Sequence, residues 1–282
     1  MNNKNVVLAC IDGSSVREPV CDYASWISKK VEAPLTLLHT IEHAHTPPVS
    51  DYSGAIGLGT REELLEELTE VEQSRSRLLI EKGQDMLRVA QERVVASGVE
   101  APQLCQRHGT LSESLIDLEE TTRVLVLGIR GEHHENESGI STQLESIIRS
   151  LHRPILVVNK EYTEPKKIML AYDGSDSCKK ALDMVASSIL FKGIPCHLVH
   201  VGDQGESLLN EAAKVLRGAD VEVTTIALSG KIDEALTAYQ AEQDIDLMLM
   251  GAFSHSRFRG LLLGSFTEKM LKNTNKPLLL LR

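Results

Sequence analysis

The sequence predicts an α/β protein of two tandem doubly wound, Rossmann-like domains, each with a five-stranded parallel sheet flanked by helices. Three observations lead to this prediction. Short, nearly continuous runs of Val, Ile and Leu are typical of parallel strands that are covered on both faces. Apolar residues at helical spacing separate these runs, as in right-handed βαβ units. The whole arrangement then occurs a second time in the same chain.

The repeat is visible in landmarks that keep their order. An Asp-Gly-Ser motif follows the first apolar run of each copy, and a histidine ends the second run, both at an offset of 161 (173 − 12). Later landmarks recur at a spacing of only 123 (251 − 128), so the first copy contains about 38 additional residues (161 − 123). The paired landmarks are Asp12 and Asp173, His39 and His200, Gly128 and Gly251, Glu145 and Glu268, and Pro154 and Pro277.

Each copy reads as strand, helix, strand, helix, strand, helix, strand, glycine-containing loop, helix and strand. In the second copy the predicted strands cover residues 167–172, 195–201, 221–228, 246–250 and 277–281. Helical spacing of Leu182, Val185, Ala186 and Ile189 predicts a helix over 177–190, and a second helix is predicted over 232–242.

The repeat divides the chain into domains at residues 1–160 and 166–282. The polar segment 159–165 between them predicts a linker that few contacts cross. The first domain carries the insertion, over residues 43–97. Its first part, 43–60, has the prolines and glycines of a loop, and 61–95 reads as a long helix. Its first turns are rich in glutamate, which suits the positive end of a helix dipole.

Composition excludes several classes of protein. The 282 residues are 42% hydrophobic and 25% charged, as in a folded soluble protein. The net charge of −10 and the ten aromatic residues oppose a nucleic-acid-binding role. No apolar stretch is long enough for a membrane span, and the first residues do not resemble a signal peptide. Five cysteines without a C-x-x-C pair predict unpaired thiols in a cytoplasmic protein.

The residues at the carboxyl ends of the strands are the candidate site, because ligands of open α/β sheets bind there at the switch in strand order. In the second copy the segment 251–267 has a glycine at each end of the loop, cationic side chains between them, and Ser265 or Thr267 as the cap of the next helix. This pattern predicts a phosphate-binding loop, or alternatively a serine-capped helix without a ligand. The candidate residues are Ala171, Tyr172, Asp173, Val201, Gly251, Ser254, His255, Arg257, Gly264, Ser265 and Phe266.

Other chemistries are less well supported. The chain has no G-x-x-x-x-G-K-[ST] motif, no dinucleotide fingerprint and no G-x-S-x-G elbow. His133 and His134 lack the spacing of a zinc site and read as solvated surface. His39 and His200 end apolar runs, where a histidine tied to the backbone is expected rather than a catalytic base. We therefore predict no catalytic residues and no metal ligands.

The repeated unit resembles the universal stress protein family over the whole chain. The resemblance rests on the strand that ends in Asp-Gly-Ser, the strand that ends in histidine, and a G-x2-G-x9-G-[ST] loop before the last helix. The second copy has Ser254 at the second glycine of this loop, and the first copy has Ser141 at the third. The resemblance implies a sheet in the order 3-2-1-4-5 and, as in many members, ATP bound without rapid turnover.

Carried over by position, the resemblance places Asp173 and the backbone of Val201 against adenine, and Gly251, Ser254, Gly264, Ser265 and Phe266 around ribose and phosphates. The equivalent residues of the first domain are Asp12, Thr40, Gly128, Gly131, Ser141 and Thr142. Ser141 obstructs close approach of a phosphate, and Glu132, Glu135 and Glu137 repel it, whereas His255, Arg257 and Arg259 attract it. The second domain is therefore expected to bind nucleotide, with or without Mg²⁺, and the first domain weakly or not at all.

Family members pair through their final strands. Here segments 154–158 and 277–281 are expected to pair within one chain and to form an intramolecular pseudo-dimer, and the long inserted helix is a candidate for a further homodimer. Three functions remain open: a nucleotide-responsive stress protein without rapid turnover, an interaction scaffold that has lost nucleotide binding, and an ATP-using enzyme. The absence of a general base beside the phosphate loop opposes the third.

Overall fold

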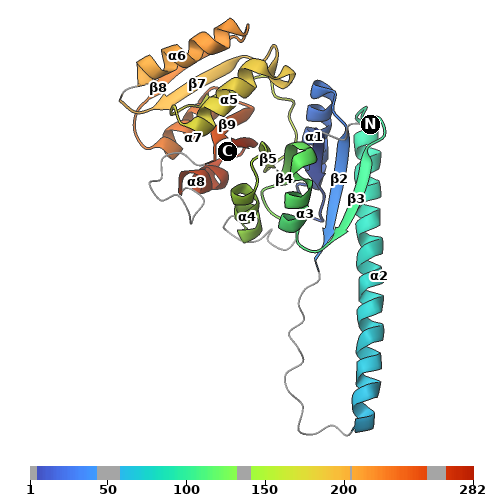
Figure 1. Ribbon diagram of the computed structural model, residues 1–282. Coiled ribbons are helices and arrows are strands. Elements are labelled where there is room, and N and C mark those ends of the chain that lie inside the picture. Colours follow the sequence, from blue (N-terminus) through green and yellow to red (C-terminus); the bar gives the residue numbers. More distant parts are fainter. Residues whose placement is uncertain (1–4, 43–57, 132–140, 204, 253–264) are drawn as a thin grey trace.

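The computed structural model describes residues 5–42, 58–131, 141–203, 205–252 and 265–282 (Figure 1). Strands and helices alternate along both copies, as predicted. The first domain consists of β1 (Val6–Cys10), α1 (Arg17–Val31), β2 (Leu35–Ile41), α2 (Leu58–Ala96), β3 (Gln103–His108), α3 (Leu111–Leu118), β4 (Thr122–Gly128), α4 (Thr142–Ser150) and β5 (Ile155–Val158). The second consists of β6 (Ile168–Ala171), α5 (Asp176–Ser187), β7 (Cys196–Val201), α6 (Gly205–Gly218), β8 (Val223–Leu228), α7 (Ile232–Glu242), β9 (Leu247–Gly251), α8 (Ser265–Asn273) and β10 (Leu278–Leu281).

The strands form one ten-stranded sheet in the order β3-β2-β1-β4-β5-β10-β9-β6-β7-β8. Each half has the order 3-2-1-4-5 and is parallel, which confirms the predicted fold class. The halves meet where β5 pairs antiparallel with β10, with Leu156 opposite Leu279. The expected pairing of segments 154–158 and 277–281 is therefore present within the chain.

The hydrophobic core continues across the two domains on both faces of the sheet. One cluster of buried residues joins α1, α2, α5 and α6, and the other joins α3, α4, α7 and α8. Because the apolar edges of both half-sheets are covered by each other, neither cluster ends at the junction. The two domains thus share one core, although each has its own sheet order.

The linker between the domains is more firmly held than the sequence suggested. The ring of Tyr162 packs edge-on against Tyr23 of α1, with 4.8 Å between centroids, and the Tyr23 hydroxyl donates to the Thr163 carbonyl at 3.3 Å. The Asn159 amide donates to the carbonyls of Thr274 and Lys276 at 2.8 and 2.9 Å. The expectation that few contacts cross this segment is wrong, because β5–β10 pairing brings elements of both domains against it.

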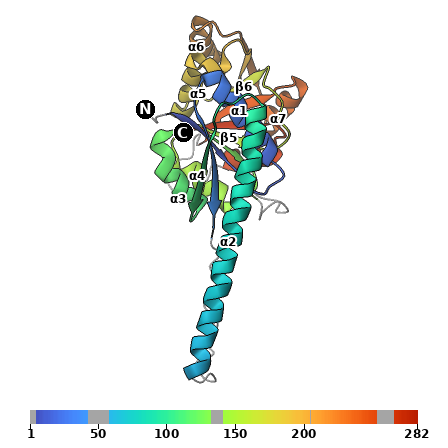
Figure 2. The same ribbon diagram turned by 90° about the vertical axis from the view of Figure 1, so that its right-hand side faces the viewer.

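Helix α2 spans 39 residues, close to the predicted helix over 61–95. Its last turns bury Met86, Leu87, Ala90 and Val94 in the core. Its earlier turns extend well beyond the sheet as a single rod (Figures 1 and 2). The predicted loop over 43–60 is shortened, since 58–60 belong to the helix and 43–57 lie outside the described residues.

One smaller difference from the predicted helices has a local cause. Helix α5 ends at Ser187 rather than at residue 190, because Ser188 is extended and its hydroxyl accepts from the Leu190 amide to begin a short 3₁₀ turn.

All five cysteines are free thiols, as predicted. Burial raises the pKa of Cys21 and of Cys196 to about 12. None of the helices in the described ranges is long and apolar enough to cross a bilayer.

A half-buried histidine, His197, predicts a pH-dependent stability. His197 of β7 lies 2.7 Å from the Tyr239 hydroxyl, and burial, assisted by the charge of Lys167, lowers the pKa of His197. Below about pH 6.5 the unfolded chain takes up a proton at this residue that the folded chain resists. His197 should therefore reduce the free energy of unfolding as the pH falls through that range. An NMR titration should give its imidazole a midpoint below about 6.5, and a higher midpoint would contradict the prediction.

Candidate functional site

The carboxyl ends of β1 and β2 are joined by a histidine. Nδ1 of His39 donates to the Ile11 carbonyl at 2.8 Å, and the Ile11 amide donates to the Leu38 carbonyl at 2.7 Å. Because a carbonyl only accepts, Nδ1 carries the proton. The histidine thus fixes the backbone immediately before Asp12, where the switch in strand order lies.

The second domain repeats this arrangement. Nδ1 of His200 donates to the Tyr172 carbonyl at 2.8 Å, and the Tyr172 amide donates to the Val199 carbonyl at 2.8 Å. Both histidines are therefore backbone ties, as the sequence analysis predicted. In both domains they position the aspartate that follows.

The Asp-Gly-Ser motif forms a local turn around each aspartate. Oδ1 of Asp12 accepts from the Ser14 amide at 3.0 Å and from the Ser14 hydroxyl at 2.5 Å. Oδ1 of Asp173 likewise accepts from the Ser175 amide at 2.9 Å. One carboxylate oxygen of each residue is thus held by its own turn, which orients the carboxylate at the strand end.

The glycines that end β4 and β9 are required by packing within the domain. A Cβ on Gly128 would lie 2.5 Å from the side chain of Val16, and a Cβ on Gly251 would overlap Ser177. Both neighbours belong to the segment that begins the helix after the first strand of the domain. These glycines therefore let that helix approach the strand end, independently of any ligand.

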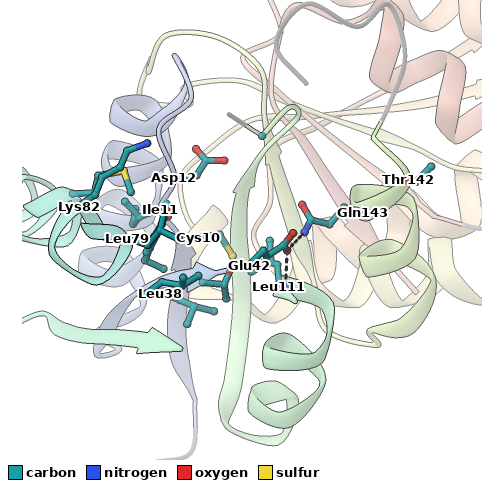
Figure 3. Close-up of a pocket in the computed structure, with 15 residues that line it drawn as sticks. Cys10, Ile11, Asp12, Leu38, Glu42, Leu79, Lys82, Leu111, Thr142 and Gln143 are labelled. Atoms are coloured by element: carbon teal, nitrogen blue, oxygen red, sulfur yellow. Dashed lines mark hydrogen bonds between the residues drawn. The ribbon is translucent and has the colours of Figure 1, made fainter. Parts of the chain in front are cut away.

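A cavity of about 360 Å³ opens at the carboxyl ends of β1 and β2 in the first domain. Its volume is typical of small-molecule sites. Four of the six residues predicted for this domain line it, namely Asp12, Thr40, Gly131 and Thr142. The remaining wall comes from Cys10, Ile11, Leu38, His39, Ile41, Glu42, Leu79, Lys82, Met86, Leu111 and Gln143. Figure 3 draws the lining residues as sticks around the space between β1, α2 and α4 and labels ten of them.

Glu42 is a site residue that sequence reasoning missed. Its Oε1 accepts from the Gln143 side chain at 2.5 Å and from the Leu111 amide at 3.2 Å, so it links α3 and α4 across the cavity (Figure 3). With Asp12 it gives the cavity two carboxylates. The available signal was its position three residues after His39, at the end of the same strand.

The start of α4 is already capped from within the chain. The Ser141 hydroxyl accepts from the Leu144 amide at 3.1 Å and is buried. An amide that a phosphate would contact is therefore satisfied by this side chain. This position supports the expectation that Ser141 disfavours phosphate in the first domain.

Cys10 also lines the cavity. Burial, with a smaller contribution from the Asp12 charge, raises the pKa of its thiol.

In the second domain the described candidates lie around the ends of β6, β7 and β9. Ala171 and Tyr172 are buried, and the Tyr172 ring belongs to the core cluster on the α5 face. Val201 and Phe266 are half-buried against the opposite cluster. Ser265 begins α8. Thr267 is not a cap, because its buried hydroxyl donates to the Ala252 carbonyl at 2.6 Å.

Part of the predicted phosphate loop lies outside the described residues, namely Ser254, His255, Arg257, Arg259 and Gly264. His133 and His134 are also outside them. Among the residues that are described, no group of three or more His, Cys, Asp or Glu is arranged to hold a metal ion.

Comparison with known proteins gives consistent matches. The sequence model of the universal stress protein family matches residues 4–159 and 202–282. Universal stress protein Slr1230 of Synechocystis sp. is 37% identical over 99% of this chain and 100% of its own length. A universal stress protein of Mycolicibacterium smegmatis is 20% identical over 98% of this chain and 96% of its own. The crystal structure of a universal stress protein from Archaeoglobus fulgidus shares the fold, with a TM-score of 0.72, 18% identity and coverage of 99% and 98% of the two chains.

Proposed function

The chain belongs to the universal stress protein family, and from that premise we propose that it binds an adenine nucleotide, ATP, mainly in its second domain. We further propose that the nucleotide is retained without rapid turnover and that its occupancy regulates the protein. The observation that carries the proposal is the strand-end framework that both domains share, in which a histidine and an Asp-Gly-Ser turn hold the end of the first strand. In the first domain this framework borders a cavity lined by four of the residues predicted for a nucleotide site. The fold that forms this cavity is present twice.

The same framework supports a site in the second domain. His200 holds the Tyr172 carbonyl as His39 holds the Ile11 carbonyl, both at 2.8 Å. Asp173 then follows β6 as Asp12 follows β1, each with Oδ1 bound by its Asp-Gly-Ser turn. A nucleotide base at the Asp173 carboxylate and phosphates toward the start of α8 would use this geometry.

Charge favours the second domain for a triphosphate. The first-domain cavity contains two carboxylates, Asp12 and Glu42, against the single lysine Lys82. In the sequence, Gly131 is followed by Glu132, Glu135 and Glu137. The corresponding sequence of the second domain instead supplies His255, Arg257 and Arg259. Like charges repel a phosphate chain and opposite charges attract it, so the two repeats are expected to differ in affinity for ATP.

Slow turnover follows from the chemistry of the described groups. The Asp173 carboxylate is engaged by the Ser175 amide, and a carboxylate that also binds the base is not available to activate water. Hydrolysis would need a general base within hydrogen-bond reach of the attacking water. We therefore expect bound ATP to persist on the protein.

Calorimetric titration of the full chain with Mg-ATP tests the proposal. We expect one ATP per chain and a rise of several degrees in the melting midpoint at saturating ligand. Asp173→Ala should weaken binding roughly ten- to hundredfold, since hydrogen bonds to charged groups contribute about 1.5–3 kcal/mol. Asp176→Ala is the matched control, because this carboxylate is 97% exposed on the next turn and should leave affinity unchanged.

Three other outcomes would contradict parts of the proposed function. Two equivalent sites per chain would show that the charge difference between the repeats does not decide affinity. No binding at millimolar ATP would favour the scaffold function. Release of phosphate within seconds of mixing would indicate an ATP-using enzyme instead.

A further inference from the structure

The part of α2 that extends beyond the sheet carries an exposed apolar face. Leu68, Val71 and Leu78 are 39%, 64% and 66% exposed. Positions separated by three and seven residues lie on the same side of a helix, so these side chains form one stripe. Large apolar residues are seldom left exposed in a row along a helix without a partner.

This segment has no counterpart in the other domain. Helix α6, which follows β7 as α2 follows β2, has only 14 residues and lies along the sheet. The turns of α2 that match α6 begin near Gly83, whose position against His39 corresponds to that of Gly205 against His200. The extension is therefore not needed to complete the domain. Among the described residues, Leu68, Val71 and Leu78 remain exposed, and a helix without packing partners has little to stabilise it in water. A partner along the stripe is therefore expected.

Charge along the extension identifies the kind of partner. Along the described turns of the extension, two acidic residues, Glu70 and Glu72, come before two basic residues, Arg75 and Arg77. Glu70, Glu72 and Arg75 are exposed. If two copies of this helix paired in parallel, the acidic segment of one would lie against the acidic segment of the other. In opposite directions they place the acidic half of each against the basic half of the other.

We propose that the extension of α2 is a homodimer interface, in which two copies of the chain pair antiparallel about a point near Gln73. The interface is closed and isologous, because each copy contributes the same surface. Leu68 of one copy then lies beside Leu78 of the other. Strands β5 and β10 are already paired with each other within the chain, so their edges do not join two copies. The proposal does not depend on nucleotide binding.

Sedimentation of the full chain over a range of micromolar concentrations tests the interface. The mass should approach twice the 31.1 kDa of one chain as concentration rises. Leu68→Asp combined with Leu78→Asp should return it to one chain without loss of folding, since both side chains are exposed. The matched control is Val215→Asp combined with Ile232→Asp, two exposed apolar residues of the second domain that should leave the dimer intact.

Cysteine cross-linking tests the direction of pairing. The unmodified chain is the control, because any cross-link that it forms must come from the five native cysteines. In the antiparallel dimer, two copies of residue 68 are about 15 Å apart along the helices, too far for a disulfide, whereas 68 and 78 are adjacent. A mixture of Leu68→Cys and Leu78→Cys chains should therefore cross-link, and neither variant alone should.

Charge reversal supplies a second test of the same arrangement. Arg75→Glu with Arg77→Glu should weaken the dimer, and adding Glu70→Lys with Glu72→Lys should restore it. A monomer at every concentration would overturn the proposal. A dimer that survives the Leu68→Asp and Leu78→Asp pair, or cross-linking of Leu68→Cys alone, would also overturn it.

Discussion

Leu279→Asp is expected to cause the largest loss of stability of any single change considered, roughly 4 kcal/mol or more. Leu279 is 1% exposed at the centre of β10, where it faces Leu156 of β5 in the antiparallel pair. The substitution removes a buried apolar side chain and places an unpaired carboxylate in the core that both domains share. Urea unfolding followed by circular dichroism would measure the change.

The shape of the unfolding curve carries further information. Because both core clusters cross the junction, the unmodified chain should unfold in one transition. The variant should show two, as β5 and β10 separate. Leu104→Asp on β3, an outer strand, is the control, because Leu104 is 44% exposed and its replacement should change stability little. Equal effects of the two substitutions would refute a shared core.

Gly83→Ala and Gly205→Ala should each destabilise the protein by about 1–3 kcal/mol, although alanine normally favours a helix over glycine. A Cβ on Gly83 would overlap the amide of the Gln106 side chain and would lie 2.5 Å from Cδ2 of His39. A Cβ on Gly205 would lie 2.7 Å from Cδ2 of His200. Neither ring is free to move away, because each is fixed by its hydrogen bond to a backbone carbonyl. Thermal unfolding of the variants would measure the cost.

Gly218→Ala provides the matched control at the other end of α6. No atom of the described residues lies within 4 Å of the position that its Cβ would take, so this substitution should be neutral or slightly stabilising. If the histidine ring is the obstacle, His200→Ala should remove most of the penalty of Gly205→Ala in a double-mutant cycle. Additive effects of the two substitutions would contradict the contact as the cause.

Much of the fold and part of the candidate site could be predicted from the sequence, because each landmark of one copy could be checked against its counterpart in the other. The Asp-Gly-Ser turns and the strand-end histidines each follow from a landmark that occurs twice, whereas the β5–β10 pairing was expected from the resemblance to the family. Asp12, Thr40, Gly131 and Thr142 were expected in one site and line one cavity. Their positions at strand ends fix their location once the sheet order is known.

The features that could not be predicted depend on how elements pack against each other in three dimensions. Leu79, Lys82 and Met86 of α2 line the cavity, but an amphipathic pattern does not state where along a sheet a 39-residue helix begins to pack. To predict Glu42 as a site residue, one would need to know that α3 and α4 both come within hydrogen-bond distance of its carboxylate. Gly128 and Gly251 were correctly predicted to end strands. Glycine is required at these positions because Val16 and Ser177 pack against them, and these contacts are seen only in the three-dimensional structure.

The pairing of β5 with β10 also sets an order of events during synthesis on the ribosome. Strand β5 ends at Val158 and its partner begins at Leu278, 120 residues later (278 − 158). At about 5–20 residues per second, the ribosome needs roughly 6–24 s to make that interval. Throughout this time the first domain presents an apolar strand edge of the kind that pairs with other chains. The nascent protein therefore has a defined interval in which chaperone protection matters most, and it closes when β10 emerges.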